Sequence, residues 1–271
     1  MVNFHVAPSK IHETLAENIL VDGFHLAIDL SKSHGCWLYD ALEKREILDF
    51  YSYFASLPIG HNHPKLLEDQ KFLESLHWAA IANPSNSDIY TSEFAAFVKT
   101  FSSIAKPPEF THLFFIAGGA LAVENALKAA FDWKARKNKL AKVVAKGEQI
   151  LHFKQAFHGR SGYTLSLTNT DPIKTRYFPK FSWPRIINPK LTFPLTNENL
   201  KITIEKEKEA LAAIKAAFEQ NQQDIAAIII EPIQGEGGDN HFRGEFLRQL
   251  RQVADEEEAL LIYDEVQTGL G

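Results

Sequence analysis

A mostly parallel α/β sheet with helices on both faces is the fold that this sequence predicts. Two observations favour it: short, continuously apolar segments recur along the chain, and segments with helical spacing of apolar residues lie between them. Strands that are apolar throughout are typical of parallel sheets, which are covered on both sides. The expected strands are residues 111–118, 149–153, 224–232 and 259–264.

The segments between these strands carry the expected helices. One helical pattern follows residue 118, a charged amphipathic one covers 198–220, and a third spans 246–254. Residues 158–195 are interrupted by five prolines and are expected to be mostly loop.

The first part of the chain has a different pattern. Short stretches at 25–30, 36–40 and 47–54 indicate small strands and turns, and the strand–helix alternation begins only after the GHNHP motif at 60–64. We therefore expect residues 1–55 to form an N-terminal segment, and residues 56–271 to form the main domain.

Composition excludes several classes of function. The chain has 271 residues, 45% of them apolar, and 34 acidic against 29 basic residues give a net charge of −5, which does not favour nucleic-acid binding. Its densest basic group, 134–139, is expected at a helix end, where cations are favourable. A single cysteine, Cys36, no apolar run long enough to span a bilayer and no signal-like segment indicate a cytoplasmic protein.

Polar and glycine-rich residues follow the expected strands, at the edge where such sheets bind ligands. Gly118, Gly119 and Ala120 lie between a strand and a helix, so open backbone N–H groups at a helix N-terminus could bind a phosphate. A plain glycine turn explains this stretch equally well.

The loop after the second strand reads QAFHGRSGY. An aromatic residue such as Phe157 can stack on a planar ligand, and Arg160 can hold a carboxylate with two hydrogen bonds. His158 is expected to be only a hydrogen-bonding residue of a surface loop.

Acidic residues follow the last two strands. Glu231 ends one strand, and Glu236 lies among glycines that allow a close approach to a ligand, although a solvated loop is the alternative. Asp264 follows a buried strand, where a carboxylate needs a partner such as a protonated ring nitrogen, unless it only caps the next turn. The nearby Asp239 and His241 lack metal-ligand spacing, so no metal site is expected.

Taken together, the motifs resemble those of the class III pyridoxal-phosphate-dependent aminotransferases of fold type I. GHNHP, GGALAVENALK, FHGRS, EPIQGEGG and DEVQTG occur in the family's order from about residue 30 onward. The resemblance implies pyridoxal 5'-phosphate as cofactor, a homodimer, a small domain that includes residues 1–55, and a large cofactor-binding domain from residue 56. It also implies roles for individual residues: phosphate binding by Gly119 and Ala120, ring stacking by Phe157, pairing with the ring nitrogen by Asp264, contact with the ring oxygen by Gln267, and substrate binding by Arg160 and Glu236.

Within the family, three stretches look most like members that transfer the ε-amino group of L-lysine to 2-oxoglutarate. They are GGALAVENALK, NPSNSDIYT and EGGDNHF. An ω-aminotransferase for 4-aminobutyrate or ornithine is the nearest alternative. An aminomutase of the glutamate-1-semialdehyde type and a non-catalytic cofactor-binding protein are the others.

The family's Schiff-base lysine lies on a strand past the DEVQ motif. Since Lys128 lies within the phosphate helix and Lys154 precedes the FHGR loop, we expect no catalytic lysine within this chain and place it beyond Gly271. The resemblance thus predicts an incomplete large domain, a C-terminally truncated fragment that is inactive alone.

Overall fold

The computed structural model describes residues 5–270 and divides into two compact units, Met1–Lys106 and Pro107–Gly271. Each unit is described by itself below. The predicted small-domain and large-domain segments, 1–55 and 56–271, concern the domains of the family fold and stay predictions.

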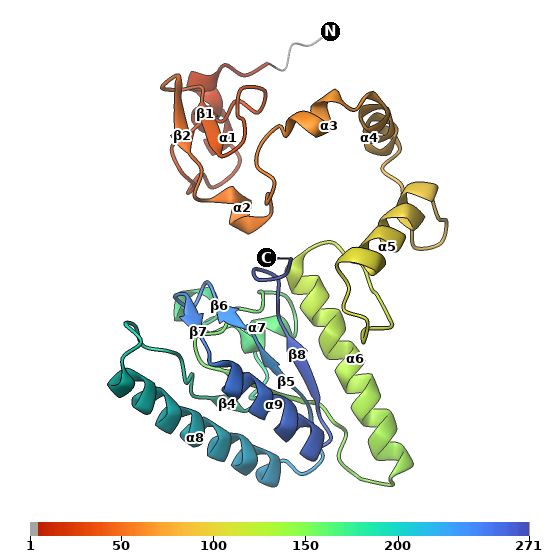
Figure 1. The fold of residues 1–271 in the computed structure, drawn as a ribbon, viewed down its shortest axis with the longest axis vertical. Coiled ribbons are helices and arrows are strands. Elements are labelled where there is room, and N and C mark those ends of the chain that lie inside the picture. The colour runs from red at the N-terminus through yellow and green to blue at the C-terminus, as the bar shows by residue number, and fades with distance from the viewer. Residues whose placement is uncertain (1–4, 271) are drawn as a thin grey trace. The chain divides into compact units, whose positions relative to one another are not determined.

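The first unit holds a small antiparallel hairpin and several helices (Figure 1). Strand β1 (Trp37–Asp40) pairs with β2 (Arg45–Leu48), whereas residues 25–30 contribute only an isolated bridge between Ile28 and Asp40. The small strand expected within 36–40 is thus confirmed, whereas the stretch 47–54 holds only the end of β2 before α2, and 25–30 forms no full strand. The remaining elements are η1 (Pro8–Lys10), α1 (Ile11–Ala16), α2 (Ser52–Ala55), α3 (Pro64–Glu68), α4 (Gln70–Ala82) and α5 (Ser92–Ile104).

The GHNHP motif is fixed by local contacts within this unit. His61 Nε2 lies 2.9 Å from Asp49 Oδ2, and both side chains are buried. Gly60 has a φ of +74° and packs so closely on the backbone of Gly35 that a Cβ would not fit. The motif thus joins the loop after β2 to the turn before β1.

The second unit is a four-stranded sheet with helices on both faces (Figure 1). Strand order is β4–β3–β5–β8 and every pairing is parallel. The predicted α/β fold is therefore confirmed. The elements of the unit are α6 (Gly119–Leu140), β3 (Gln149–Phe153), α7 (Thr164–Leu167), η2 (Pro172–Lys174), β4 (Arg185–Ile186), α8 (Asn197–Gln220), β5 (Ile225–Ile230), β6 (Ile233–Gln234), β7 (Asn240–His241), α9 (Gly244–Glu256) and β8 (Leu260–Tyr263).

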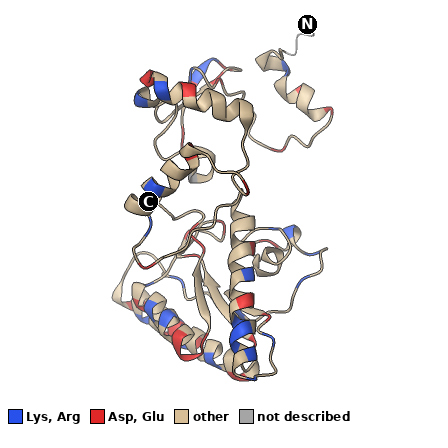
Figure 2. Cartoon of the chain, turned by 90° about the vertical axis from the view of Figure 1, so that its right-hand side faces the viewer, with Lys and Arg blue, Asp and Glu red and all other residues tan. Residues whose placement is uncertain are grey.

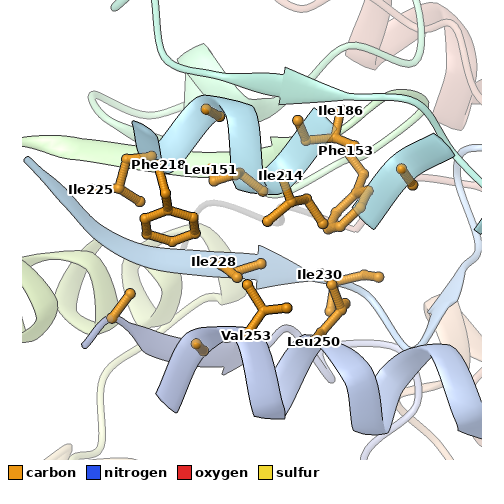
Figure 3. Close-up of a cluster of buried hydrophobic side chains, with 14 of the residues drawn as sticks. Leu151, Phe153, Ile186, Ile214, Phe218, Ile225, Ile228, Ile230, Leu250 and Val253 are labelled. Carbon is orange, nitrogen blue, oxygen red and sulfur yellow. The ribbon is translucent and has the colours of Figure 1, made fainter. Parts of the chain in front are cut away.

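Two apolar clusters cover the two faces of this sheet. Ile228 and Ile230 of β5 face α8 and α9, where they meet Ile214, Leu250 and other buried side chains (Figure 3). Ile229 faces the opposite side and packs with residues of α6 such as Leu127. Alternate residues of one strand thus enter two cores, which explains why the strand is apolar throughout.

Helix boundaries follow local chemistry. Thr196 precedes α8 and its hydroxyl accepts a hydrogen bond from the Asn199 N–H at 3.1 Å, which satisfies an amide that the helix itself cannot. Helix α6 ends with Lys137 and Lys139 in its last turn, as the basic cluster predicts. Acidic and basic residues are interspersed along the helices of this unit (Figure 2).

One member of that basic cluster lies in the interior of the unit. Lys134 is fully buried, and its amine donates to Gln223 Oε1 at 2.9 Å and to the Glu258 carbonyl at 2.8 Å. Burial lowers the pKa of this amine. Lys134 therefore ties α6 to the turns that precede β5 and β8.

Two strand predictions need correction. Residues 111–118 are not a strand, and Phe114, Phe115 and Ile116 are 70%, 41% and 41% exposed. No strand of the described chain pairs with this segment, so it lacks the ladder of backbone hydrogen bonds that defines a strand. Residues 259–264 do form β8, but the strand lies at the sheet edge and is only half-buried rather than fully buried. Among the described residues no helix is both long and apolar enough to cross a membrane.

Candidate functional site

Three loops meet at the carboxyl edge of the sheet, directly after β3, β5 and β8. Parallel strands end at the same edge, so the loops that follow them lie together. Two close contacts fix this arrangement. A Cβ at Gly159 would lie 2.6 Å from Ala120 Cβ, and the side chain of Gln267 packs on Gly235 without room for a Cβ. The FHGR loop thus touches the start of α6, and the turn after β8 touches the EGEGG loop.

The start of α6 has the features of an anion site. Gly118 precedes the helix with a φ of +92°, and within the described residues no side chain caps the helix, so the amides of the first turn have no side-chain acceptor. The helix dipole adds about half a positive charge there. Val266 covers this turn closely, since a Cβ on Gly119 would lie 2.8 Å from Val266 Cγ1. The predicted phosphate residues Gly119 and Ala120 are thus placed beside the turn that carries Asp264.

Asp264 is buried and has a buried partner. Its Oδ2 lies 2.7 Å from His158 Nδ1, and its Oδ1 accepts a hydrogen bond from the Val266 N–H at 3.2 Å. The side chains of His158 and Asp264 are 0% and 4% exposed. His158 Nε2 is buried without a hydrogen-bond partner in the described chain.

The prediction that His158 belongs to a surface loop is therefore wrong, although its role as a hydrogen-bond partner holds. The loop turns inward at this residue because Thr168 holds it on both sides. The His158 N–H donates to Thr168 Oγ1 at 2.9 Å, and Thr168 Oγ1 donates to the Gly159 carbonyl at 2.6 Å. An aromatic–histidine–glycine triplet after a buried strand was the only sequence signal for this.

Glu231 is a second buried carboxyl group of the site. Its Oε1 accepts the Phe157 N–H at 2.9 Å, which fixes the backbone of the predicted stacking residue. Burial, together with the nearby Asp264 and Glu236 carboxylates, raises the pKa of Glu231 to about 7, against the opposing effects of His158 and of the hydrogen bond from the Phe157 N–H. The sequence shows Glu231 only as an acidic residue at the end of a strand, so its hydrogen bond to the Phe157 backbone could not be predicted.

A buried glutamate of α6 holds the loop that carries Arg160. Glu124 Oε1 accepts hydrogen bonds from Ser161 Oγ at 2.9 Å and from the Thr164 N–H at 3.1 Å. The Arg160 side chain itself is exposed. The loop is therefore anchored immediately after Arg160, which itself lies exposed.

Glu236, the other predicted substrate residue, forms an ion pair with Lys174. The Lys174 amine also lies 5.5 Å from the centroid of the Phe157 ring. The structure thus brings Glu236, Lys174 and Phe157 together in one group on the same edge of the sheet. No sequence motif marked Lys174, which lies in the proline-rich loop.

Comparison with known protein families identifies the family to which this chain belongs. The family model described as aminotransferase class-III matches residues 21–271. This chain belongs to the class-III aminotransferases. The family uses pyridoxal phosphate, and the predicted fold class is that of the family.

Several relatives are named for lysine. The L-lysine-epsilon aminotransferase of Mycobacterium tuberculosis is 51% identical in sequence over 97% of this chain. That of Streptomyces clavuligerus is 50% identical over 99% of this chain. A solved structure of lysine aminotransferase from M. tuberculosis, in the internal aldimine form, has a TM-score of 0.94 at 50% identity. The match covers 98% of this chain and 61% of that one. The 4-aminobutyrate aminotransferase of Emericella nidulans is 33% identical over 96% of this chain. The chain spans 58% of the length of the curated lysine relatives.

The residues at the sheet edge fit pyridoxal phosphate. The uncapped first turn of α6 suits the phosphate group, and the buried Asp264 carboxylate suits a protonated ring nitrogen. These two groups lie on adjoining segments, because Val266 of the Asp264 turn packs on Gly119. A ligand with an anionic end and a cationic ring would therefore satisfy both.

Proposed function

We propose that the protein containing this chain is an L-lysine 6-transaminase. It transfers the ε-amino group of L-lysine to 2-oxoglutarate and gives 2-aminoadipate 6-semialdehyde and L-glutamate. This proposal rests on sequence identity: the chain is about 50% identical to enzymes named for lysine, but only 33% identical to a 4-aminobutyrate aminotransferase.

Pyridoxal phosphate, when bound, supplies the electron sink that amino-group exchange requires. The residues of this chain hold it in place. Gly119 and Ala120 bind its phosphate, Phe157 stacks on the ring, Asp264 keeps the ring nitrogen protonated, and Gln267 contacts the ring oxygen. Support comes from the open turn of α6, the fixed Phe157 backbone and the buried Asp264 carboxylate.

His158 orients Asp264 in this proposal. An Asp264 oxygen that is held at 2.7 Å by a buried imidazole cannot rotate away from the ring. The residue therefore acts on the cofactor through Asp264 and is a positioning residue.

Arg160 and Glu236 select the substrate. L-lysine presents its α-carboxylate at the end far from the reacting amine, and the exposed guanidinium of Arg160 suits it. Lysine has no carboxylate beside its reacting amine, whereas glutamate has one. Glu236 supplies a carboxylate at this position when lysine is bound and swings away when glutamate is bound.

The direct test is an assay of the holoenzyme with 2-oxoglutarate and one amino donor at a time: L-lysine, 4-aminobutyrate or L-ornithine. We expect glutamate formation to be fastest with lysine, with a semialdehyde as the second product. Faster turnover of 4-aminobutyrate or ornithine would select the alternative ω-aminotransferase. Isomerisation of glutamate-1-semialdehyde without 2-oxoglutarate would select the mutase.

We also propose that the enzyme is a homodimer. Helices α4 and α5 of the first unit have no buried residue, and they expose Trp78, Ile81 and Phe97 by 62%, 64% and 49%. Apolar surface of this kind is typical of interaction sites. Light scattering after size exclusion should give twice the mass of one chain, and a monomer mass would contradict the proposal.

The cytoplasm is the compartment that we propose for the enzyme. The single cysteine, Cys36, is exposed and unpaired, which suits a reducing environment. Cell fractionation with an antibody to the protein tests this proposal.

A further inference from the structure

Lys174 contacts two residues of the proposed site, although no motif includes it. It ends the short helix η2, which begins after Asp171, whose carboxylate accepts a hydrogen bond from the Ile173 N–H at 2.9 Å. This turn directs the Lys174 amine toward Glu236, with which it forms an ion pair, and toward the face of the Phe157 ring.

The ion pair between Lys174 and Glu236 is weak enough to break and re-form. Its two side chains are 27% and 39% exposed, so water screens the attraction. An exposed pair of this kind shifts an equilibrium only a few-fold. Glu236 is therefore held in one position but can leave it at little cost. The movement is a rotation of the Glu236 side chain, because Gly235 and Gly237 on either side of it pack closely on their neighbours.

The two substrates of the proposed reaction place opposite demands on Glu236. Lysine brings a cationic amino group to the reacting end, and a free carboxylate there is favourable. Glutamate and 2-oxoglutarate bring a second carboxylate, and an unpaired Glu236 beside it would repel it. A cation that pairs with Glu236 removes this repulsion.

We propose that Lys174 is a positioning residue that holds Glu236 aside while a dicarboxylate substrate binds. Lys174 thereby helps one site accept both a diamino acid and a dicarboxylate. The proposal rests on the proposed function, because it needs the two kinds of substrate.

The experiment uses the holoenzyme and the variants Lys174→Met, which removes the charge, and Lys174→Arg, which keeps it. Calorimetry measures the binding of glutarate, an unreactive dicarboxylate, with pentanoate as the monocarboxylate control. We expect Lys174→Met to weaken glutarate binding about two- to fivefold and to leave pentanoate binding unchanged. Lys174→Arg should restore glutarate binding, and the single-turnover reaction with glutamate should be impaired more than the one with lysine.

The effect of Lys174→Met is measured a second time in the Glu236→Gln variant, and this comparison tests whether Lys174 acts through Glu236. Lys174→Met should have no further effect on glutarate binding when Glu236 is already neutral, because the cation then has nothing to hold. Lys180→Met is the matched control, since Lys180 lies on the same loop and donates to Thr175 Oγ1 at 3.2 Å rather than to Glu236.

An equal effect of Lys174→Met in both backgrounds would show that Lys174 binds the ligand itself, and would overturn the proposal. No effect in either background would overturn it too, even if the wild-type enzyme transaminates lysine. A wild-type holoenzyme that does not use lysine and 2-oxoglutarate would instead remove the proposed function, and this proposal with it.

Discussion

Replacing Glu231 by glutamine should stabilise the protein, and increasingly so as the pH rises. Glu231 is 7% exposed, and burial raises the pKa of its carboxyl group from the ordinary 4.5 to about 7. A glutamine keeps an oxygen that can accept the Phe157 N–H, but it carries no charge that burial could penalise. The variant therefore isolates the cost of ionising this one group in the folded protein.

The sign and size follow from proton binding. Between about pH 4.5 and 7 the folded protein keeps a proton on Glu231 that the unfolded chain has lost, so the stability of the wild type falls as the pH rises. A tenfold change in proton affinity corresponds to about 1.4 kcal/mol, so the full cost is about 3 kcal/mol above pH 7. We expect the advantage of Glu231→Gln in unfolding free energy to grow by about 2 kcal/mol between about pH 5.5 and 8.

Urea unfolding at several pH values, followed by circular dichroism, measures this difference. Glu209→Gln is the matched control, because it removes a carboxylate from the exposed side of α8. An advantage of Glu231→Gln that stays constant with pH, or a wild type that gains on the variant as the pH rises, would refute the reasoning.

Three further predictions concern the site. Arg160→Lys in the holoenzyme should weaken lysine binding by about 1.5–3 kcal/mol through loss of a charged hydrogen bond, and an unchanged KM for lysine would count against the role of Arg160. His158→Phe leaves the buried Asp264 carboxylate without its partner and should destabilise the protein by about 3–5 kcal/mol in thermal or urea unfolding, whereas combining it with Asp264→Asn should recover part of that loss. The expectation that no lysine of this chain binds the cofactor covalently is tested by borohydride reduction of the holoenzyme and peptide mapping, where a label on Lys128, Lys154 or Lys174 would contradict it.

The sequence predicted where the site lies better than how its residues pair. Continuous apolar strands imply a parallel sheet, and a parallel sheet implies one edge for the residues that follow its strands, so the positions of Phe157 and Asp264 could be expected. Gly119 follows no strand of this sheet, and its place beside Val266 is set by packing that the sequence does not show. The contact between His158 and Asp264 joins residues 106 positions apart, and its geometry depends on Thr168, which no motif marks.

The errors in the strand predictions have a physical cause too. Apolar character shows that a segment prefers to leave water, but a strand also needs a neighbour for its backbone hydrogen bonds. Residues 111–118 are largely apolar but pair with no strand of the described chain, while β8 has a neighbouring strand on a single side. Burial of Lys134 could not be predicted for the converse reason, because it depends on two acceptors that lie outside its own helix.

The contact between Val266 and Gly119 has a consequence for synthesis of the protein. Gly119 opens α6, whereas Val266 follows β8, so more than half of the chain separates the two sides of this contact. A nascent polypeptide emerging from the ribosome can form α6 early, but its first turn stays uncovered until β8 docks beside β5. The turn that we propose as the phosphate site can therefore meet the segment that carries Asp264 only after β8 has been synthesised.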